Sequence, residues 1–318
     1  MDMFEECSFT ASFDGTLQKY LLAVPKDVSG AVDVLVNLHG HGSDRTQIRE
    51  DRGECRAARD VAAERGMALV SPDYRAKTSW MGPAAEADML QLLEILSKRF
   101  GGRIFLCGGS MGGTSALTYA ARHPGKISGV TAFNPLANHL SYGNFQDAIA
   151  ASFGGTKAER PDEFRARSAL YFPERFTMPL SITLGGKDAT VPPESARELA
   201  ASVAALHPAN VYVDDKADRG HATDYDASVK ALREMFRRAD ACRVTFNGKA
   251  VQPSFGSVAG VWFWSCGDAQ LLLLGFEGLP GWRAVACGAG WALNGEALPE
   301  GTRTLARSLT PERAPFDA

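Results

Sequence analysis

The chain has 318 residues, a formal net charge of -3, 45% hydrophobic residues and 22% charged residues. These values are typical of globular proteins, and the length suits one large domain and one small domain. The acidic balance excludes the basic footprint of a nucleic-acid-binding protein. No apolar run approaches the roughly 20 residues of a membrane span. The first residues are acidic where a signal peptide would be basic, so we expect a cytoplasmic protein without a membrane partner, unless a leader has been removed.

The six cysteines are scattered, and none forms a Cys-x-x-Cys pair. This pattern predicts reduced thiols and no zinc site. A disulfide between Cys266 and Cys287 remains an open alternative.

The chain begins with a predicted hairpin, in which strands at 8–13 and 18–24 flank the turn Asp14-Gly15. Strands and helices then alternate. Strands are predicted at 32–38, 67–70, 103–107, 129–133, 180–184 and 210–213, and helices at 53–64, 84–100, 115–121, 192–206 and 224–238. This alternation predicts an α/β fold over residues 1–240, a doubly wound and mostly parallel sheet with helices on both faces.

Two regions depart from this alternation of strands and helices. Residues 137–178 are rich in Phe, Tyr, Pro and Arg without a strand pattern, and we interpret them as an insertion, a candidate lid or cap. Residues 241–318 lack any helical pattern, and Asn247-Gly248 and Asn294-Gly295 each mark a tight hairpin. They predict a small all-β module of unknown role.

Four of the five tryptophans fall in this module. They are Trp262, Trp264, Trp282 and Trp291. Exposed tryptophans would stack on sugar rings and make the module a glycan-binding or partner-binding domain. The alternative is that they fill a small β-core, because aromatic side chains dominate core burial. Alternation along a strand places Trp262 and Trp264 on one face, so their burial would exclude glycan binding there.

The most informative motif is the Gly-x-Ser-x-Gly pattern around Ser110, in residues 106–114. A β-rich run precedes it and a helix-forming run follows, so the serine lies on a strand-to-helix turn. Gly108 and Gly112 have no Cβ to obstruct a tight crossing or a substrate. A phosphate-binding loop is the alternative, but neither of its glycine patterns occurs here. The motif therefore predicts a nucleophilic serine.

A serine hydroxyl needs a base, an acid that orients the base, and donors for the developing oxyanion. His221 lies between the predicted strand at 210–213 and the following helix, where a base is expected. Asp188 follows the strand at 180–184; its alternative role is a helix cap, and Asp214, Asp215 and Asp218 are rival acids. The order Ser110, Asp188, His221 is that of α/β-hydrolase triads.

The run His39-Gly40-His41-Gly42 follows an early strand, where this fold places an oxyanion donor. We expect the amides of His41 and Met111 to form the oxyanion hole, and His39 to fix the loop by hydrogen bonds. A metal site at His39 and His41 is disfavoured because no third ligand is evident, and we predict neither a metal nor a cofactor.

Residues from about 8 to 240 resemble an α/β-hydrolase fold serine esterase of the prolyl-oligopeptidase-like group. The resemblance is carried by the segments 39–42, 79–88, 108–113, 185–188 and 220–221. It implies a carboxylic ester hydrolase that forms an acyl-enzyme, with a small-molecule or oligosaccharide ester as substrate, such as an acetyl or feruloyl ester.

A peptidase or aminoacyl hydrolase of the same fold is the alternative enzyme, and an inactive scaffold is disfavoured by the intact triad. Trp80, Asn138 and His139 follow strand ends and are candidate substrate contacts.

Overall fold

The computed structural model describes residues 4–26, 30–207, 210–240, 244–251, 255–256, 261–274, 283–293 and 296–304. The larger domain is built on an eight-stranded sheet with the order β1-β2-β4-β3-β5-β6-β7-β8. The strands are β1 (Glu5–Thr10), β2 (Leu17–Ala23), β3 (Val32–Leu38), β4 (Ala68–Pro72), β5 (Gly101–Gly109), β6 (Val130–Phe133), β7 (Leu180–Gly185) and β8 (Val211–Lys216). β1 and β4 are antiparallel to β2, and β3 to β8 are parallel, which confirms the predicted doubly wound, mostly parallel sheet.

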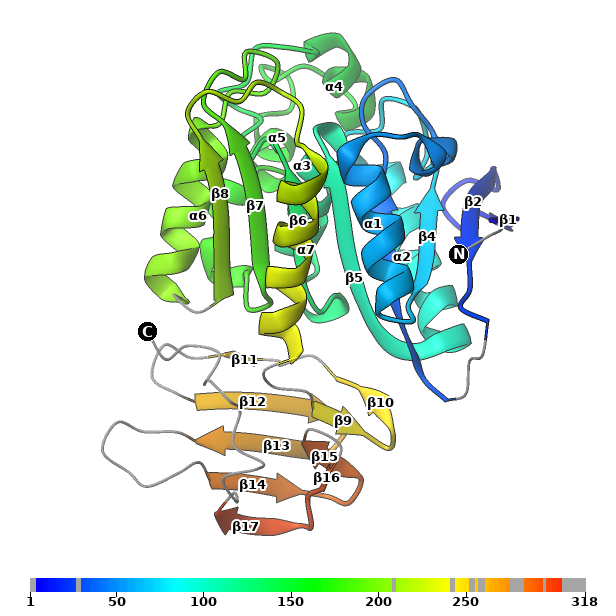
Figure 1. Ribbon diagram of the computed structural model, residues 1–318, viewed down its shortest axis with the longest axis vertical. Coiled ribbons are helices and arrows are strands. Elements are labelled where there is room, and N and C mark those ends of the chain that lie inside the picture. The colour runs from blue at the N-terminus through cyan, green and yellow to red at the C-terminus, as the bar shows by residue number, and fades with distance from the viewer. Residues whose placement is uncertain are drawn as a thin grey trace.

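Helices cover both faces of this sheet (Figure 1). α1 (Gly53–Glu64) and α7 (Tyr225–Asp240) pack on one face, and α2 (Pro83–Phe100), α3 (Met111–Arg122) and α6 (Glu194–Leu206) pack on the other. Successive strand residues alternate between the two cores, so Val34 and Val36 join one and Leu35 joins the other. Because both faces of each parallel strand are buried in this way, the sequence of the strand is a continuous apolar run.

Two of the boundaries that differ from the prediction have an identifiable cause. β1 ends at Thr10 rather than at 13, because residues 11–16 form a wider turn in which the Ala11 amide donates to the Thr16 carbonyl. α3 starts at Met111 rather than at 115, although its first turn contains two glycines. A Cβ on Gly112 would lie 2.0 Å from the Leu38 carbonyl oxygen, so Gly112 permits close packing against the β3 end.

Residues 137–178 contain no strand, as predicted, and fold into α4 (Gln146–Phe153), α5 (Pro161–Ala166) and short 3-10 turns. α4 lies beyond the carboxyl ends of the parallel strands, where the sheet would assemble a site (Figure 1). Within the described residues, no helix is both long and apolar enough to cross a bilayer.

The C-terminal module consists of two antiparallel sheets, β10-β9-β15-β16 and β11-β12-β13-β14-β17. The strands are β9 (Val244–Phe246), β10 (Lys249–Ala250), β11 (Phe255–Gly256), β12 (Val261–Cys266), β13 (Ala269–Leu274), β14 (Arg283–Cys287), β15 (Trp291–Leu293), β16 (Glu296–Ala297) and β17 (Gly301–Thr304). Side chains of both sheets share one apolar core that is separate from the cores of the larger domain. The described part of the module contains no helix.

Trp264 and Trp291 are buried in this core, which excludes both of them from an exposed sugar-binding face. Trp282 and the side chain of Trp262 lie outside the described residues. Cys266 and Cys287 are free and exposed, so the alternative of a disulfide between them is wrong. Their strands, β12 and β14, flank β13, and two strand spacings separate them by about 10 Å, beyond the reach of a disulfide.

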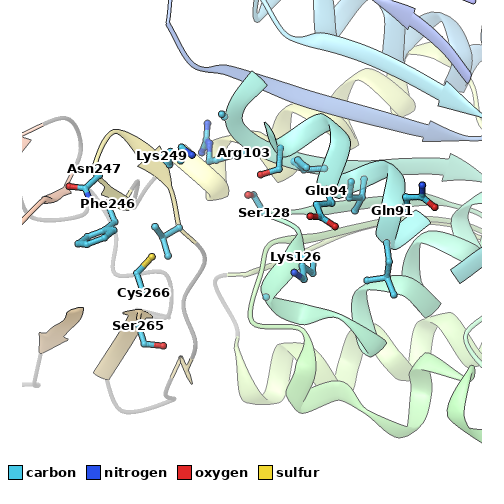
Figure 2. Close-up of a pocket in the computed structure, with 18 of the residues that line it drawn as sticks. Gln91, Glu94, Arg103, Lys126, Ser128, Phe246, Asn247, Lys249, Ser265 and Cys266 are labelled. Carbon is cyan, nitrogen blue, oxygen red and sulfur yellow. The ribbon is translucent and has the colours of Figure 1, made fainter. Parts of the chain in front are cut away.

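A cavity of about 1100 Å³ lies between the larger domain and the module (Figure 2). Its wall in the larger domain includes Gly101 and Gly102, and its wall in the module includes Phe246 and Lys249. Gly101 begins β5, whereas Ser110 follows the other end of that strand. Ile104 is the lining residue of β5 nearest to Ser110 along the strand, so at about 3.3 Å per residue the cavity lies roughly 20 Å from the serine.

Candidate active site

Ser110 stands on a sharp turn between β5 and α3, as the motif predicts. Its backbone has φ 54° and ψ -121°, a combination that is strained for a residue with a side chain. The turn is held by the Ser110 amide, which donates to the Phe133 carbonyl at 2.8 Å, and by the Ser110 carbonyl, which accepts from the Thr114 amide and hydroxyl at 2.9 Å each. The serine backbone is therefore fixed by β6 on one side and α3 on the other.

Asp188 follows β7 and is oriented by its own loop. Its Oδ1 accepts hydrogen bonds from the amides of Thr190 and Val191, both at 2.9 Å. Its Oδ2 accepts from His221 Nδ1 at 2.7 Å. The carboxylate is buried, whereas the His221 side chain is one-third exposed. Because the two amides hold Oδ1 of this buried carboxylate, Oδ2 is oriented toward the imidazole of His221.

Two of the three rival acids form ion pairs with arginines, and the third is exposed to solvent. Asp214 pairs with Arg219 at 2.8 Å, and Asp215 pairs with Arg197 at 2.7 Å. Asp218 is exposed, and among the described residues no hydrogen bond joins its side chain to the imidazole of His221. The structure thus brings Asp188, of the four candidate acids, to His221.

Asn134 connects the histidine loop to the serine turn, a role that our sequence analysis did not assign. Its Nδ2 donates to the His221 carbonyl at 2.6 Å and to Thr223 Oγ1 at 2.8 Å. Asn134 directly follows Phe133, whose carbonyl holds the Ser110 amide. Two consecutive residues at the end of β6 therefore hold the Ser110 and His221 loops against one another. The signal available in the sequence was a polar residue immediately after a predicted strand.

The loop after β3 is held by hydrogen bonds from three of its backbone amides. The Gly40 amide donates to Gln47 Oε1 at 2.7 Å, the Gly42 amide to the Lys77 carbonyl at 2.7 Å, and the Ser43 amide to the Gly40 carbonyl at 3.2 Å. Among the described residues, the amide of His41 has no hydrogen-bond acceptor. Met111 is the first residue of α3, so its amide has no partner within the helix. These are the two amides expected for an oxyanion hole.

His39 has the structural role that we predicted. Its ring is fully buried, with Nδ1 at 2.9 Å from the Gly40 carbonyl and Nε2 at 3.1 Å from the Asp73 carbonyl. Burial lowers the pKa of His39, and the neutral ring donates its one proton to one of these two carbonyls. Tyr74 donates its hydroxyl to the His39 carbonyl at 2.6 Å and holds the loop further.

The candidate substrate contacts divide by burial. Asn138 is partly exposed, whereas Trp80 and His139 are fully buried and lie beneath the surface of the site. Trp80 Nε1 donates to His41 Nδ1 at 3.1 Å, and burial lowers the pKa of His41. His41 is therefore neutral, with its proton on Nε2. Among the described residues, no group of three or more His, Cys, Asp or Glu side chains could hold a metal ion.

Comparisons with known proteins agree with this architecture. Residues 33–176 match the family model described as the alpha/beta hydrolase fold. No curated protein sequence matches the chain.

Among solved structures, an S-formylglutathione hydrolase from Agrobacterium tumefaciens shares 18% identity with a TM-score of 0.56, covering 74% of this chain and 94% of that one. Est1E from Butyrivibrio proteoclasticus shares 17% identity with a TM-score of 0.54, covering 72% of this chain and 98% of that one. An acylaminoacyl peptidase from Pyrococcus horikoshii shares 14% identity with a TM-score of 0.58 over 75% of this chain, and the match spans 42% of the peptidase. The chain therefore has the α/β-hydrolase fold, with a separate small antiparallel β module at its C-terminal end.

Proposed function

We propose that this protein is a serine hydrolase that cleaves carboxylic esters through an acyl-enzyme intermediate. The observation that carries the proposal is the orientation of the Asp188 carboxylate. Its Oδ1 is held by two amides, and its Oδ2 accepts from His221 Nδ1. This arrangement fixes the imidazole tautomer with the proton on Nδ1. The Nε2 atom is then free to accept a proton from a serine hydroxyl.

In the proposed reaction, Ser110 Oγ attacks the ester carbonyl carbon while His221 Nε2 takes the hydroxyl proton. The carbonyl oxygen becomes an oxyanion and accepts hydrogen bonds from the His41 and Met111 amides. The carbon–oxygen bond to the alcohol then breaks, and His221 returns the proton to the departing alkoxide. Water, deprotonated by the same imidazole, attacks the acyl-serine and releases the acid.

A panel of esters and anilides tests this proposal. We expect the wild type to hydrolyse acetyl or longer acyl esters, and Ser110→Ala to lose about 10³-fold or more of kcat/KM. A fluorophosphonate should label the wild type at Ser110 and leave Ser110→Ala unlabelled. Failure of the wild type both to cleave any ester and to react with the probe would overturn the proposal.

A peptidase of the same fold is the second candidate, since an acylaminoacyl peptidase and a puromycin hydrolase share this architecture. The matches span 42% and 38% of those chains, so the comparison supports the fold that the enzymes share. Aminoacyl anilides beside esters of the same acyl group separate the two candidates. Cleavage of the anilides alone would replace the esterase by the peptidase.

A further inference from the structure

Four aromatic rings, those of His41, Trp80, Tyr142 and Phe145, form a cluster of tilted ring contacts at the loop after β3. We call this group the aromatic shelf. The ring centroids are 4.3 Å apart for His41 and Phe145, 5.8 Å for His41 and Trp80, and 5.7 Å for Trp80 and Phe145. Trp80 and Tyr142 are buried, whereas Phe145 is 37% exposed. The shelf therefore runs from the core to the surface and ends in an exposed apolar ring.

Phe145 lies between the two loops that carry the proposed oxyanion donor and the acid. On one side its ring contacts His41. On the other side the preceding residues are bonded to the loop after Asp188. Asn144 Nδ2 donates to the Ala189 and Thr190 carbonyls at 3.2 and 3.0 Å, and the Tyr142 hydroxyl donates to the Thr190 carbonyl at 2.7 Å. The 137–178 segment thus holds the Phe145 ring against the site.

The identity of residue 145 has no explanation in local structure. Phe145 precedes α4 with φ 54°, in the left-handed region that disfavours a large side chain. Its side chain makes no capping hydrogen bond, and the only contribution of the residue to the helix is its carbonyl, which accepts from the Ile149 amide. Asn or Gly would serve this position with less strain. A phenylalanine here points to a use for the ring itself.

The chemistry of the shelf defines what this ring would contact. The Trp80 Nε1 proton is donated to His41, and the Tyr142 hydroxyl proton is donated to Thr190. The shelf therefore presents mainly carbon. Of the four rings, only His41, through its Nε2 proton, would offer a hydrogen bond to the hydroxyl groups of a sugar stacked on the shelf, and burying the other hydroxyl groups unpaired is costly. A flat aromatic ring needs no such partners and gains from stacked or edge contacts with the shelf.

We propose that Phe145 is a specificity-determining residue of the proposed ester site, and that it binds a flat aromatic ring in the substrate. This inference rests on the proposed esterase function, and it narrows the substrate to esters with an aryl group near the reacting carbonyl. The aryl group could belong to the acid or to the alcohol, and the chemistry that recognises it is the same.

Matched substrate pairs test the inference. Ethyl 3-phenylpropanoate against ethyl 3-cyclohexylpropanoate varies the ring in the acid, and benzyl acetate against cyclohexylmethyl acetate varies it in the alcohol. We expect the wild type to prefer the flat ring by about 2- to 10-fold in kcat/KM in one pair. Phe145→Leu, which keeps apolar volume, should abolish the preference, and Phe145→Tyr should keep it. The pair that responds identifies the aryl source.

Phe13→Leu is the control, because Phe13 is also exposed, at 57%, but lies in the β1–β2 turn. It should leave the preference unchanged. Binding of 3-phenylpropanoic and 3-cyclohexylpropanoic acid to Ser110→Ala, with and without Phe145→Leu, provides a readout independent of turnover.

If the wild type cleaves esters with the same ring preference as Phe145→Leu, the proposed role of Phe145 is wrong and the proposed esterase function is retained. If the protein cleaves no ester but binds the flat ring through Phe145, the proposed esterase function is wrong and the proposed role of Phe145 is retained.

Discussion

At the scale of single residues, the two oxygens of Asp188 have different tasks. Oδ1 is held by the Thr190 and Val191 amides, and Oδ2 accepts from His221. In Asp188→Asn the amide oxygen would keep the two backbone donors, so the NH₂ group would face His221 Nδ1. The imidazole would then have to accept at Nδ1 and carry its proton on Nε2, where it could not take the Ser110 proton.

We therefore expect Asp188→Asn to lose about 10⁴-fold of kcat on esters with little change in KM or in stability. The measurement is steady-state kinetics beside thermal unfolding of the same samples. Asp215→Asn is the control, because Asp215 lies on an exposed ion pair with Arg197. A loss below tenfold in Asp188→Asn would remove Asp188 from the proposed triad.

At the scale of elements, one carboxylate ties the 137–178 segment to the helices beneath it. Glu86 on α2 lies 2.6 Å from Arg122 and from His123 at the end of α3, and 2.8 Å from Arg167 after α5. Burial alone would raise the pKa of Glu86. The hydrogen bonds from His123 and Arg122 and the charge of Arg167 outweigh it and lower the pKa to about 2.

This pKa predicts a pH-dependent contribution to stability. Because folding favours the ionised form, the contribution is complete above the unfolded-state pKa near 4.5 and is lost as pH falls toward 2. We expect Glu86→Gln to cost about 3 kcal/mol of unfolding free energy at pH 7, measured by urea denaturation, and the difference from wild type to shrink below pH 4.

Glu94→Gln provides the matched control for this prediction, because Glu94 lies on the same helix in an exposed pair with Lys98. It should leave the free energy of unfolding nearly unchanged at every pH, because solvent screens an exposed ion pair. If the effect of Glu86→Gln were the same at pH 3 and pH 7, the ionised carboxylate would not be what joins the segment to α2 and α3.

At the scale of the whole molecule, the apolar cores of the larger domain share no residue with the core of the C-terminal module. The last helix of the larger domain, α7, is anchored within that domain, because Asp240 pairs with Arg103 at 2.7 Å and with Arg65 at 2.6 Å. We propose that residues 1–240 and 241–318 are separate folding units and that ester cleavage resides in the first.

Calorimetry of the full chain should then show two unfolding transitions, because separate cores melt separately. A chain ending at residue 240 should keep one transition and cleave small esters with kcat/KM within about twofold of the full chain. A single transition in the full chain, together with an inactive truncated chain, would show that the module completes the larger domain.

Much of the fold followed from residue patterns because those patterns are local. The buried strand at 32–38 and the helix at 53–64 agree with β3 and α1 residue for residue, since apolar runs and glycine stops depend on neighbours in the chain. The glycine-rich start of α3 was missed, because helix propensity disfavours glycine there and only packing against the β3 end makes it helical.

The sequence alone determined the order of strands and helices, the turn that carries Ser110, and the candidates Asp188 and His221 that follow later strands. The tertiary structure decided which acid meets the histidine, that the His41 amide has no acceptor among the described residues, and that Asn134 joins two loops of the site. It also decided that Trp80 lies inside the aromatic shelf and that Phe145 is its exposed end. These outcomes depend on contacts between residues tens of positions apart, and no local pattern records which distant partner a side chain will meet.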